Sequence, residues 1–230
     1  MARYHTILFD ADQTLLDFHR SEREAITEML RGYGLCVTER MVADYSRINQ
    51  NAWRRLELGE ITKKELRTLR FSELCALYGF DFDPDEMATR YIRALSAKSY
   101  MMDGALECCQ ALAAHCRLYV ITNGMAVVQH GRFDPSPLAP FFKGAFISDD
   151  IGHEKPGKPY FDYVKAHIPD FDPADTLVVG DSLSSDIKGA VLAGLDSCWF
   201  NPDGKPAPEG LPITYTVSSL GEIVPLVLGA

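Results

Sequence analysis

Carboxylate side chains follow short apolar runs at two distant places in the chain. Asp10 and Asp12 come directly after one such run, and Asp181 and Asp186 come after another. Short, continuous apolar runs are typical of buried parallel strands. The carboxyl ends of such strands lie along one edge of a sheet, where open α/β sheets bind their ligands. We therefore expect these four carboxylates to gather at one site.

Hydroxyl, amide and ammonium groups follow the other predicted strands. Thr122 and Asn123 come after the apolar run 118–121, and Lys155 lies in the loop beyond the next predicted strand. Hydroxyl and amide groups can donate hydrogen bonds to phosphate oxygens, and a lysine adds a positive charge. Lys158 is close to Lys155 and is also followed by a proline, so the residues alone leave two candidates for this lysine.

A divalent cation is needed if these carboxylates share a site, because like charges at close range oppose one another's ionisation. Magnesium prefers oxygen ligands, keeps several waters and takes one or two carboxylates together with a substrate phosphate. The candidate magnesium ligands are Asp10, Asp12, Asp181 and Asp186. Asp10 and Asp181 are the natural direct ligands, and Asp186 could hold a metal-bound water.

Phosphoryl transfer is the reaction that would use this set of groups. A carboxylate such as Asp10 can attack phosphorus and form an aspartyl-phosphate. Lys155 and the metal would neutralise charge on the phosphoryl oxygens, while Thr122 and Asn123 would donate hydrogen bonds to them. Asp12 can protonate the leaving oxygen and then deprotonate the water that hydrolyses the intermediate. We therefore predict Asp10, Asp12, Thr122 and Lys155 as catalytic residues, and Asp10, Thr122, Asn123 and Lys155 as phosphate-binding residues.

The elements that must position these residues predict an α/β fold with a doubly wound parallel sheet. After Asp103, helical patterns alternate with runs rich in β-branched residues, which indicates parallel strands covered on both faces. The predicted strands are 6–9, 118–121, 145–147, 177–179, 198–200 and 214–217. The predicted helices of this part are 105–114, 159–167, 186–193 and a last helix near the C-terminus, and Asp186 is also expected to cap the third of them.

A stretch of four predicted helices separates the first strand from the rest of the sheet. Ser21 and Thr62 each precede a glutamate at capping-box spacing, and apolar residues recur at helical spacing between caps and glycines. The predicted helices are 21–34, 39–58, 62–79 and one that begins at Asp83. Short loops between them favour a small helical bundle. We predict a helical domain at residues 17–97, inserted into an α/β domain formed by residues 1–16 and 98–230.

Composition narrows the possible partners. The 230 residues carry a net charge of -9, and 47% of them are hydrophobic, which suits a globular chain with an acidic surface. With no run of Lys and Arg, the sequence predicts neither nucleic-acid nor membrane binding. The first apolar run is too short for a signal peptide, and the six cysteines form no C-x-x-C pair, so we expect reduced thiols and a cytoplasmic protein. No exposed apolar repeat is visible, so a monomer is expected.

The motifs resemble those of the haloacid dehalogenase (HAD) superfamily. Its phosphatases carry D-x-D-x-T, a Thr or Ser after the second strand, a lysine and G-D-x-x-x-x-D. The chain has these elements in the same order, at residues 10–14, 122, 155 and 180–186. The resemblance covers nearly the whole chain and implies that the helical insertion is a C1 cap. By resemblance, the spacing from Ser148 and Gly152 favours Lys155 over Lys158.

A narrower resemblance is to the bacterial pyrimidine 5′-nucleotidases, through residues 9–18, 121–124, 180–194, 198–201 and 215–220. It implies hydrolysis of nucleoside 5′-monophosphates with a preference for pyrimidines. The chain departs from that subfamily at residues 132–137, which replace a more helical connection. It also has Ser148-Asp149 where the subfamily usually has Ser-Glu. Both departures leave the substrate preference open.

Other functions use the same fold. A sugar phosphatase or a phosphomutase would need the same pair of aspartates, whereas dehalogenases of the superfamily lack the acid at position 12. A silent binding protein would have lost a catalytic position, and none is lost here. Substrate selection must come from elsewhere, and Phe18, Arg20, Trp53 and Arg54 are the candidates, because an aromatic ring can stack on a base and an arginine can reach a phosphate. For Trp53, a place in the core of the bundle is the favoured alternative.

Overall fold

The computed structural model describes residues 2–229, which fall into two compact units. The first unit, here called the core unit, comprises the chain up to Phe18 and from Ser99 onward. The second, the helical unit, is His19–Lys98. The chain therefore crosses between the units twice, at residues 18–19 and 98–99.

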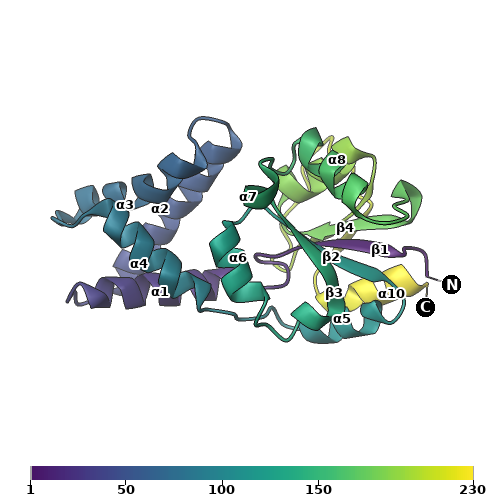
Figure 1. Ribbon diagram of the computed structural model, residues 1–230, viewed down its shortest axis with the longest axis horizontal. Coiled ribbons are helices and arrows are strands. Elements are labelled where there is room, and N and C mark those ends of the chain that lie inside the picture. Colours follow the sequence, from purple (N-terminus) through teal and green to yellow (C-terminus); the bar gives the residue numbers. More distant parts are fainter. Residues whose placement is uncertain (1, 230) are drawn as a thin grey trace. The chain divides into compact units, whose positions relative to one another are not determined.

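The core unit is built on a six-stranded parallel sheet with the strand order β3-β2-β1-β4-β5-β6 (Figure 1). The strands are β1 (Thr6–Asp10), β2 (Arg117–Thr122), β3 (Phe142–Ile147), β4 (Thr176–Gly180), β5 (Asp196–Phe200) and β6 (Tyr215–Val217). The order reverses direction between β1 and β4, which makes the sheet doubly wound and confirms the predicted fold class. The carboxyl ends of these two central strands are therefore where a ligand is expected.

Helices cover both faces of this sheet, as the continuous apolar strands require. In β1, Ile7 and Phe9 pack with α5 (Ala105–Ala113) and α10 (Ile223–Leu228). Leu8 points to the other face and packs with α8 (Lys158–His167) and α9 (Lys188–Ala193). Figure 1 shows α8 above the sheet, and α5 and α10 below it.

The helical unit contains α2 (Glu39–Glu57), α3 (Lys63–Tyr78), α4 (Pro84–Ser96) and most of α1 (Phe18–Gly32). The predicted capping box at Thr62 and Glu65 is present, and Asp83 caps α4 as predicted. The predicted cap at Ser21 is wrong. The helix begins three residues earlier, and Ser21 is buried within it, where its hydroxyl donates to the main-chain oxygen of Lys98 at 3.2 Å. The hydroxyl therefore has a partner other than the helix end.

Buried aromatic and polar side chains share the interior of the helical unit. The rings of Tyr45, Phe71 and Tyr91 pack with centroids 5.2–5.5 Å apart. Next to them, Glu22 accepts a hydrogen bond from Asn49 Nδ2 at 2.6 Å. Asn49 Oδ1 in turn accepts one from a buried arginine, Arg70 Nη1, at 2.8 Å. Burial raises the pKa of Glu22, although Ser46 and Asn49 hydrogen bonds oppose that shift.

Short helical elements complete the core unit. They are α6 (Ala126–Phe133), α7 (Ser148–Ile151), the 3₁₀ turns η1 (Ala139–Phe141), η2 (Pro173–Asp175) and η4 (Leu220–Glu222), and the π-helical turn η3 (Leu183–Ile187). The predicted cap at Asp186 is wrong, because the helical path already begins at Leu183 and Ser182 caps it by accepting from the Ser185 N–H. This shift places Asp186 inside the turn and leaves its carboxylate available for other contacts.

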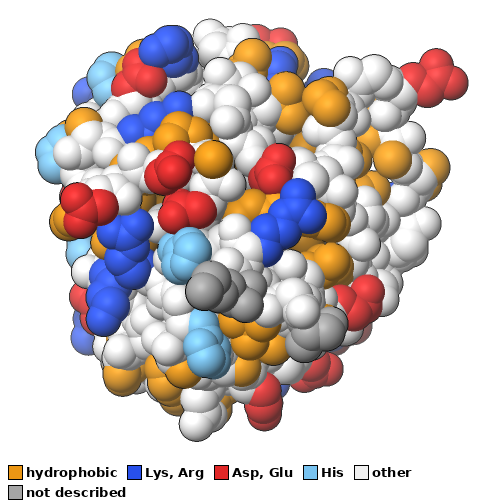
Figure 2. Space-filling model, turned by 90° about the vertical axis from the view of Figure 1, so that its right-hand side faces the viewer, with side chains coloured by type: hydrophobic (Ala, Val, Ile, Leu, Met, Phe, Trp, Pro, Cys, Tyr) orange, Lys and Arg blue, Asp and Glu red, His pale blue; other side chains and the backbone are white. Residues whose placement is uncertain are grey.

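On the face seen in Figure 2, acidic and basic side chains are interspersed with apolar ones. Among residues 2–229, no helix is long and apolar enough to cross a membrane. All six cysteines are free thiols, as predicted, and only Cys36 is exposed.

Candidate active site

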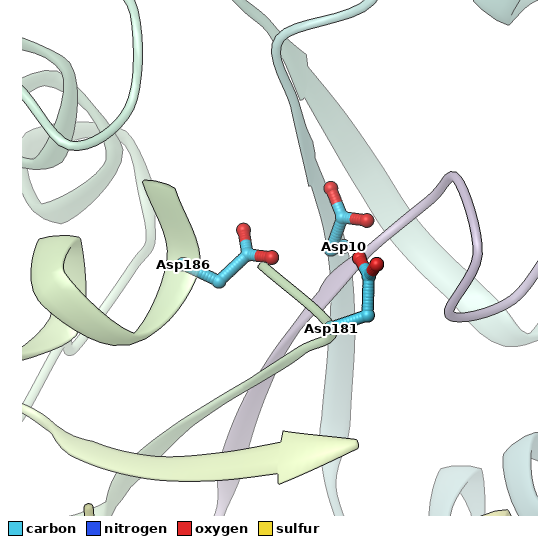
Figure 3. Close-up of side chains that lie close together, drawn as sticks. All are labelled: Asp10, Asp181 and Asp186. Atoms are coloured by element: carbon cyan, nitrogen blue, oxygen red, sulfur yellow. The ribbon is translucent and has the colours of Figure 1, made fainter. Parts of the chain in front are cut away.

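The carboxylates of Asp10, Asp181 and Asp186 face one another at the carboxyl edge of the sheet (Figure 3). Each offers one oxygen, and these oxygens all lie within 4.8 Å of one another. Asp10 ends β1 and Asp181 directly follows β4, so both come from the place where the strand order reverses. A Cβ atom at Gly180 would lie 2.3 Å from Asp186 Oδ2, so only a glycine allows this approach. We call these three residues the acidic cluster.

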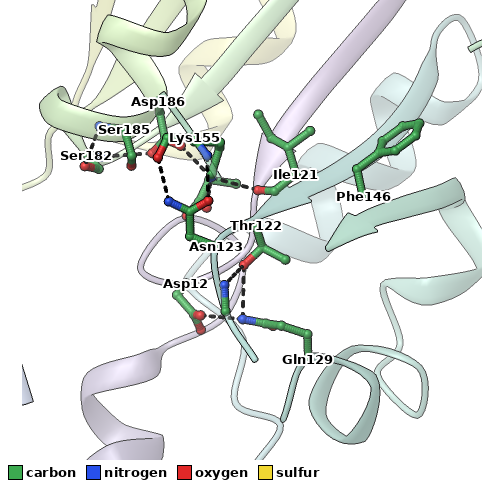
Figure 4. A network of polar contacts seen from close by, with 12 residues as sticks. Asp12, Ile121, Thr122, Asn123, Gln129, Phe146, Lys155, Ser182, Ser185 and Asp186 are labelled. Atoms are coloured by element: carbon green, nitrogen blue, oxygen red, sulfur yellow. Dashed lines mark hydrogen bonds and ion pairs between the residues drawn. The ribbon is translucent and has the colours of Figure 1, made fainter. Parts of the chain in front are cut away.

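The ammonium group of Lys155 lies between two of these carboxylates. Its Nζ donates to Asp10 Oδ1 at 2.6 Å and to Asp186 Oδ1 at 2.7 Å. A third bond, at 2.9 Å, goes to the main-chain oxygen of Ile121 (Figure 4). Lys155 is buried, so its three donors all have acceptors away from bulk water. Lys158 is exposed and pairs with Asp162 at 2.6 Å, outside this group.

Burial and mutual repulsion change the ionisation of the acidic cluster. Burial and then the charge of Asp186 raise the pKa of Asp181 to about 7. The same two causes raise the pKa of Asp10 well above its ordinary value, although Lys155 opposes them. Burial alone would lower the pKa of Lys155, but the nearby carboxylates outweigh it and raise that pKa. Lys155 therefore remains a cation. Its single positive charge does not remove the repulsion among the three carboxylates.

The acidic cluster fits a divalent cation with a preference for oxygen ligands. Three ionised carboxylates and one ammonium group leave two excess negative charges, which one such cation would balance. Both oxygens of Asp186 already accept hydrogen bonds, from Lys155 and from the Ser182 N–H at 3.1 Å. Asp10 and Asp181 are therefore better suited to bind the cation directly, and Asp186 to bind it through water.

Thr122 and Asn123 lie beside this group at the end of β2. The N–H of Thr122 donates to the Tyr160 hydroxyl at 3.1 Å, and that hydroxyl donates to the Phe146 main-chain oxygen at 2.7 Å. Asn123 exchanges two hydrogen bonds of 2.8 Å with the main chain of Lys155. These contacts attach the loop after β2 to the segment that carries the lysine. Both the nitrogen and the oxygen of the Asn123 side chain are therefore hydrogen-bonded to that segment.

Asp12 has different partners from the acidic cluster. Arg132 Nη1 forms an ion pair with Asp12 Oδ1. Gln129 Nε2 donates to Asp12 Oδ2 at 2.6 Å (Figure 4). Gln129 Nε2 also donates to Thr122 Oγ1 at 3.2 Å. The acidic cluster found among the described residues thus contains three of the four predicted magnesium ligands and does not contain Asp12.

Sequence reasoning missed Gln129 and Arg132. Both lie on α6, which directly follows the Thr122-Asn123 loop and was not predicted, because the segment before Asp134 lacks a clear cap and apolar period. Their spacing of three residues on one short helix is the signal that could have found them. The hydroxyl of Thr14, from the first motif, is buried and has no hydrogen-bond partner within the described chain.

The four predicted substrate-selecting residues are separated between the units. Phe18 belongs to the core unit, where the guanidinium carbon of Arg132 lies 5.6 Å from the centre of its ring. Arg20, Trp53 and Arg54 belong to the helical unit. Arg20 pairs with Glu24, Arg54 donates to Asn51 at 2.9 Å, and Trp53 is half-buried. Their role in substrate selection stays a prediction.

A known protein family matches the part of the chain that forms this site. The family model of the haloacid dehalogenase-like hydrolases matches residues 4–194, a range that includes every residue of this site. The chain belongs to the haloacid dehalogenase-like hydrolases. In this chain, Asp10, Asp181 and Asp186 lie together with Lys155 at the carboxyl edge of the sheet.

Three bacterial relatives align over most of the chain. The HAD-hydrolase YfnB of Bacillus subtilis is 43% identical over 97% of this chain and 95% of its own length. Pyrimidine 5′-nucleotidase PynA of Streptococcus pneumoniae is 36% identical over 86% and 84%. Pyrimidine 5′-nucleotidase YjjG of Escherichia coli is 31% identical over 98% of both chains.

Solved structures of haloacid dehalogenase-like proteins share the fold. An orthorhombic crystal structure of YfnB, described as bound to magnesium and as revealing interdomain movement, superposes with a TM-score of 0.94 at 41% identity, over 98% of this chain and 99% of the other. The L-2-haloacid dehalogenase of Xanthobacter autotrophicus gives a TM-score of 0.75 at 19% identity, over 100% and 99%. The second likeness bears on the fold alone.

Proposed function

We propose that this hydrolase is a magnesium-dependent phosphomonoesterase that works through an aspartyl-phosphate on Asp10. The observation that carries the proposal is the position of Lys155, whose ammonium group binds both Asp10 and Asp186 within 2.7 Å. A buried cation beside a buried carboxylate, with Asp181 next to them, can hold a phosphoryl group against the nucleophile. The resemblance of the four motifs to HAD phosphatases supports the same chemistry.

In the first half-reaction, an oxygen of Asp10 attacks phosphorus and the bond between phosphorus and the alcohol oxygen breaks. Protonated Asp12 gives its proton to the departing oxygen, so that a neutral alcohol leaves. Lys155 neutralises part of the charge on the phosphoryl oxygens, and Thr122 donates a hydrogen bond to one of them. The products are the alcohol, an aspartyl-phosphate on Asp10 and ionised Asp12.

In the second half-reaction, water attacks the phosphorus of the aspartyl-phosphate. Asp12 takes a proton from this water, and the bond between phosphorus and the Asp10 oxygen breaks. Inorganic phosphate leaves, the Asp10 carboxylate is restored, and Asp12 holds the proton that it gives to the next leaving group. The net reaction consumes one phosphate ester and one water.

Asp10 and Asp181 would hold the magnesium ion, with Asp186 binding it through water. The donor set and the two excess negative charges described above support this assignment. When bound, the ion supplies positive charge to the phosphoryl oxygens and relieves the repulsion among the carboxylates. The YfnB crystal structure described as bound to magnesium supports the same cofactor for this chain.

The substrate class that we propose is the nucleoside 5′-monophosphates, with a preference for pyrimidines. The names of the PynA and YjjG relatives support it, at 31–36% identity over most of the chain. Base selection would fall to residues outside the phosphate site, with Phe18, Arg20, Trp53 and Arg54 as candidates. Phosphatase activity on sugar phosphates is the alternative use of the same catalytic groups.

A substrate panel tests this proposal. Phosphate release would be measured with 4-nitrophenyl phosphate, the pyrimidine and purine nucleoside 5′-monophosphates and several sugar phosphates, each with magnesium or with EDTA. We expect magnesium-dependent release that is fastest with pyrimidine nucleotides and absent in Asp10→Asn. Equal rates with sugar phosphates would remove the nucleotide preference and leave the mechanism. No release from any ester would reject the phosphatase function.

A further inference from the structure

An arginine with no exposed surface pairs with the carboxylate of Asp12. The Arg132 side chain is 0% exposed, while that of Asp12 is 28% exposed. A guanidinium group cannot lose its proton in a protein, so its burial requires an anionic or strongly accepting partner. Asp12 supplies that partner through Oδ1. The pair therefore joins a fixed buried cation to a carboxylate that can still reach solvent and substrate.

The second oxygen of Asp12 is also held. Gln129 Nε2 donates to Asp12 Oδ2 at 2.6 Å, and Gln129 is itself buried. A Cβ atom at Gly124 would lie 2.1 Å from Gln129 Nε2, so the glycine provides the space that Gln129 occupies. With one donor on each oxygen, the plane and direction of the Asp12 carboxylate are both set.

Arg132 is fixed by contacts at both ends of the residue. Its guanidinium group lies over the ring of Phe18, with 5.6 Å between the guanidinium carbon and the ring centre. Its main-chain oxygen accepts a hydrogen bond of 2.5 Å from the hydroxyl of Ser99. Phe18 and Ser99 are the two core-unit residues at which the chain crosses to the helical unit. Arg132 therefore contacts Asp12 and also both core-unit residues, Phe18 and Ser99, at which the chain passes between the two units.

We propose that Arg132 is a positioning residue for the proton transfers of Asp12, with Gln129 as its partner on the second oxygen. This inference rests on the proposed phosphatase function. Arg132 acts through Asp12 and does not itself contact the phosphate. It holds the carboxylate where it can reach the leaving oxygen and, later, the attacking water. Phe18 serves in this arrangement by covering the guanidinium group.

Substrates whose leaving groups differ in basicity can show whether Arg132 acts on the proton transfers of Asp12 or only stabilises the fold. A nucleoside or sugar leaves as a basic alkoxide unless it is protonated, whereas 4-nitrophenolate is stable without a proton. Because kcat/KM reports the steps up to cleavage of the ester, it depends on Asp12 only for the basic leaving group. Loss of the Asp12 position should therefore reduce kcat/KM for an alkyl phosphate much more than for 4-nitrophenyl phosphate.

The experiment is a double-mutant cycle of Arg132→Met and Asp12→Asn in the full chain with magnesium, using the fastest alkyl phosphate of the panel and 4-nitrophenyl phosphate. We expect Arg132→Met to reduce kcat/KM for the alkyl phosphate by about 10²- to 10⁴-fold, the usual range for general acid–base catalysis. In the Asp12→Asn background, Arg132→Met should cause almost no further loss. Arg132→Lys, which keeps the charge, should recover part of the rate. Equal losses on both substrates, or losses that multiply in the double mutant, would overturn the inference.

Two further variants keep the outcome clear. Gln129→Met should give the same dependence on the leaving group, and it decides the question if Arg132→Met does not fold. Arg117→Met is the matched control, because Arg117 lies in the core unit and contacts Thr6 at 2.8 Å instead of Asp12. It should leave the ratio of the two substrates unchanged. Activity retained in Asp10→Asn would instead reject the proposed function itself, so the two failures are distinguishable.

Discussion

Lys155 Nζ lies 2.6 Å from Asp10 Oδ1, although 145 positions separate the two residues in the sequence. Both side chains are buried at the carboxyl edge of the sheet, and the same ammonium group reaches Asp186 at 2.7 Å. One cation thus offsets two carboxylates that burial would otherwise leave unpaired. This arrangement makes Lys155 important to stability as well as to the binding of phosphate.

Replacing Lys155 by Met should therefore reduce both activity and stability. Removing one partner of a buried ion pair costs about 3–5 kcal/mol in the free energy of unfolding, because a buried charge remains without its partner. Lys158→Met is the matched control, since the exposed pair of Lys158 with Asp162 contributes only about 0–1 kcal/mol. Urea unfolding in EDTA and phosphate release in magnesium would measure the two effects. Equal behaviour of the two variants would mean that the lysine of the site is misassigned.

Magnesium should stabilise the chain through the acidic cluster. The pKa of Asp181, raised to about 7 in the fold, exceeds the ordinary value of about 3.9, so the folded protein without metal binds a proton more tightly than the unfolded chain. Stability in EDTA should therefore fall as the pH rises from about 4 to about 7. Magnesium at a hundred times its Kd should add about 2.7 kcal/mol at pH 8.

Asp181→Asn tests both parts of that prediction. At pH 8 in EDTA, the variant should unfold at a higher temperature than the native chain, because one repelling charge is gone. It should gain little from added magnesium, since a direct ligand is also gone. Thermal unfolding of both proteins, with and without magnesium, would measure these two opposite changes in unfolding temperature. A variant that still gains the full stabilisation from magnesium would exclude Asp181 as a ligand.

Glu22 in the helical unit should give a second dependence of stability on pH. Burial raises the pKa of Glu22, so its proton is held more tightly in the fold and stability declines as the pH rises above the ordinary glutamate value of about 4.3. Glu22→Gln should remove that part of the decline. Hydrogen exchange of α1 and α2 at several pH values would measure it, with Glu24→Gln, on the same helix but partly exposed, as the control. Parallel pH profiles for native chain and Glu22→Gln would contradict the assignment.

Gly124→Ala should disturb catalysis through Gln129. The added methyl group would meet the Gln129 side chain, with Nε2 at 2.1 Å and Cγ at 2.9 Å, and must displace it. Asp12 and Thr122 then each lose a donor. We expect a loss of kcat/KM on alkyl phosphates that is larger than the loss on 4-nitrophenyl phosphate. Gly144→Ala, where the nearest atom would be 3.9 Å away, is the control and should retain the native rates.

The sequence was sufficient to predict the sheet and most of its helices, because the signals are local. Continuous apolar runs mark β1, β2 and β4, and Thr62 with Glu65 marks the start of α3. The helix start at Phe18 was missed, because Ser21 has cap spacing but its hydroxyl finds a partner on Lys98, far along the chain. A contact of that kind depends on tertiary packing, which periodicity does not report.

The acidic cluster was predictable for a similar reason, since Asp10 and Asp181 directly follow strands whose ends must meet. The partners of Asp12 could not be predicted from the sequence. Arg132 and Gln129 lie on α6, a short helix whose pattern is weak, and nothing local indicates that a buried arginine there pairs with a carboxylate 120 positions earlier. Such a pairing follows only from the parallel pairing of β1 with β2, which places the segments after these two strands next to each other.

Trapping the covalent intermediate shows directly whether Asp10 is the nucleophile. The native chain would be mixed with magnesium and excess substrate, quenched within milliseconds, reduced with borohydride and digested for mass spectrometry. An aspartyl-phosphate is reduced by borohydride to homoserine, whereas a free carboxylate is not. We predict homoserine at position 10, dependent on both magnesium and substrate. Homoserine at another aspartate, or efficient turnover with Asp10 always recovered intact, would exclude Asp10 as the nucleophile.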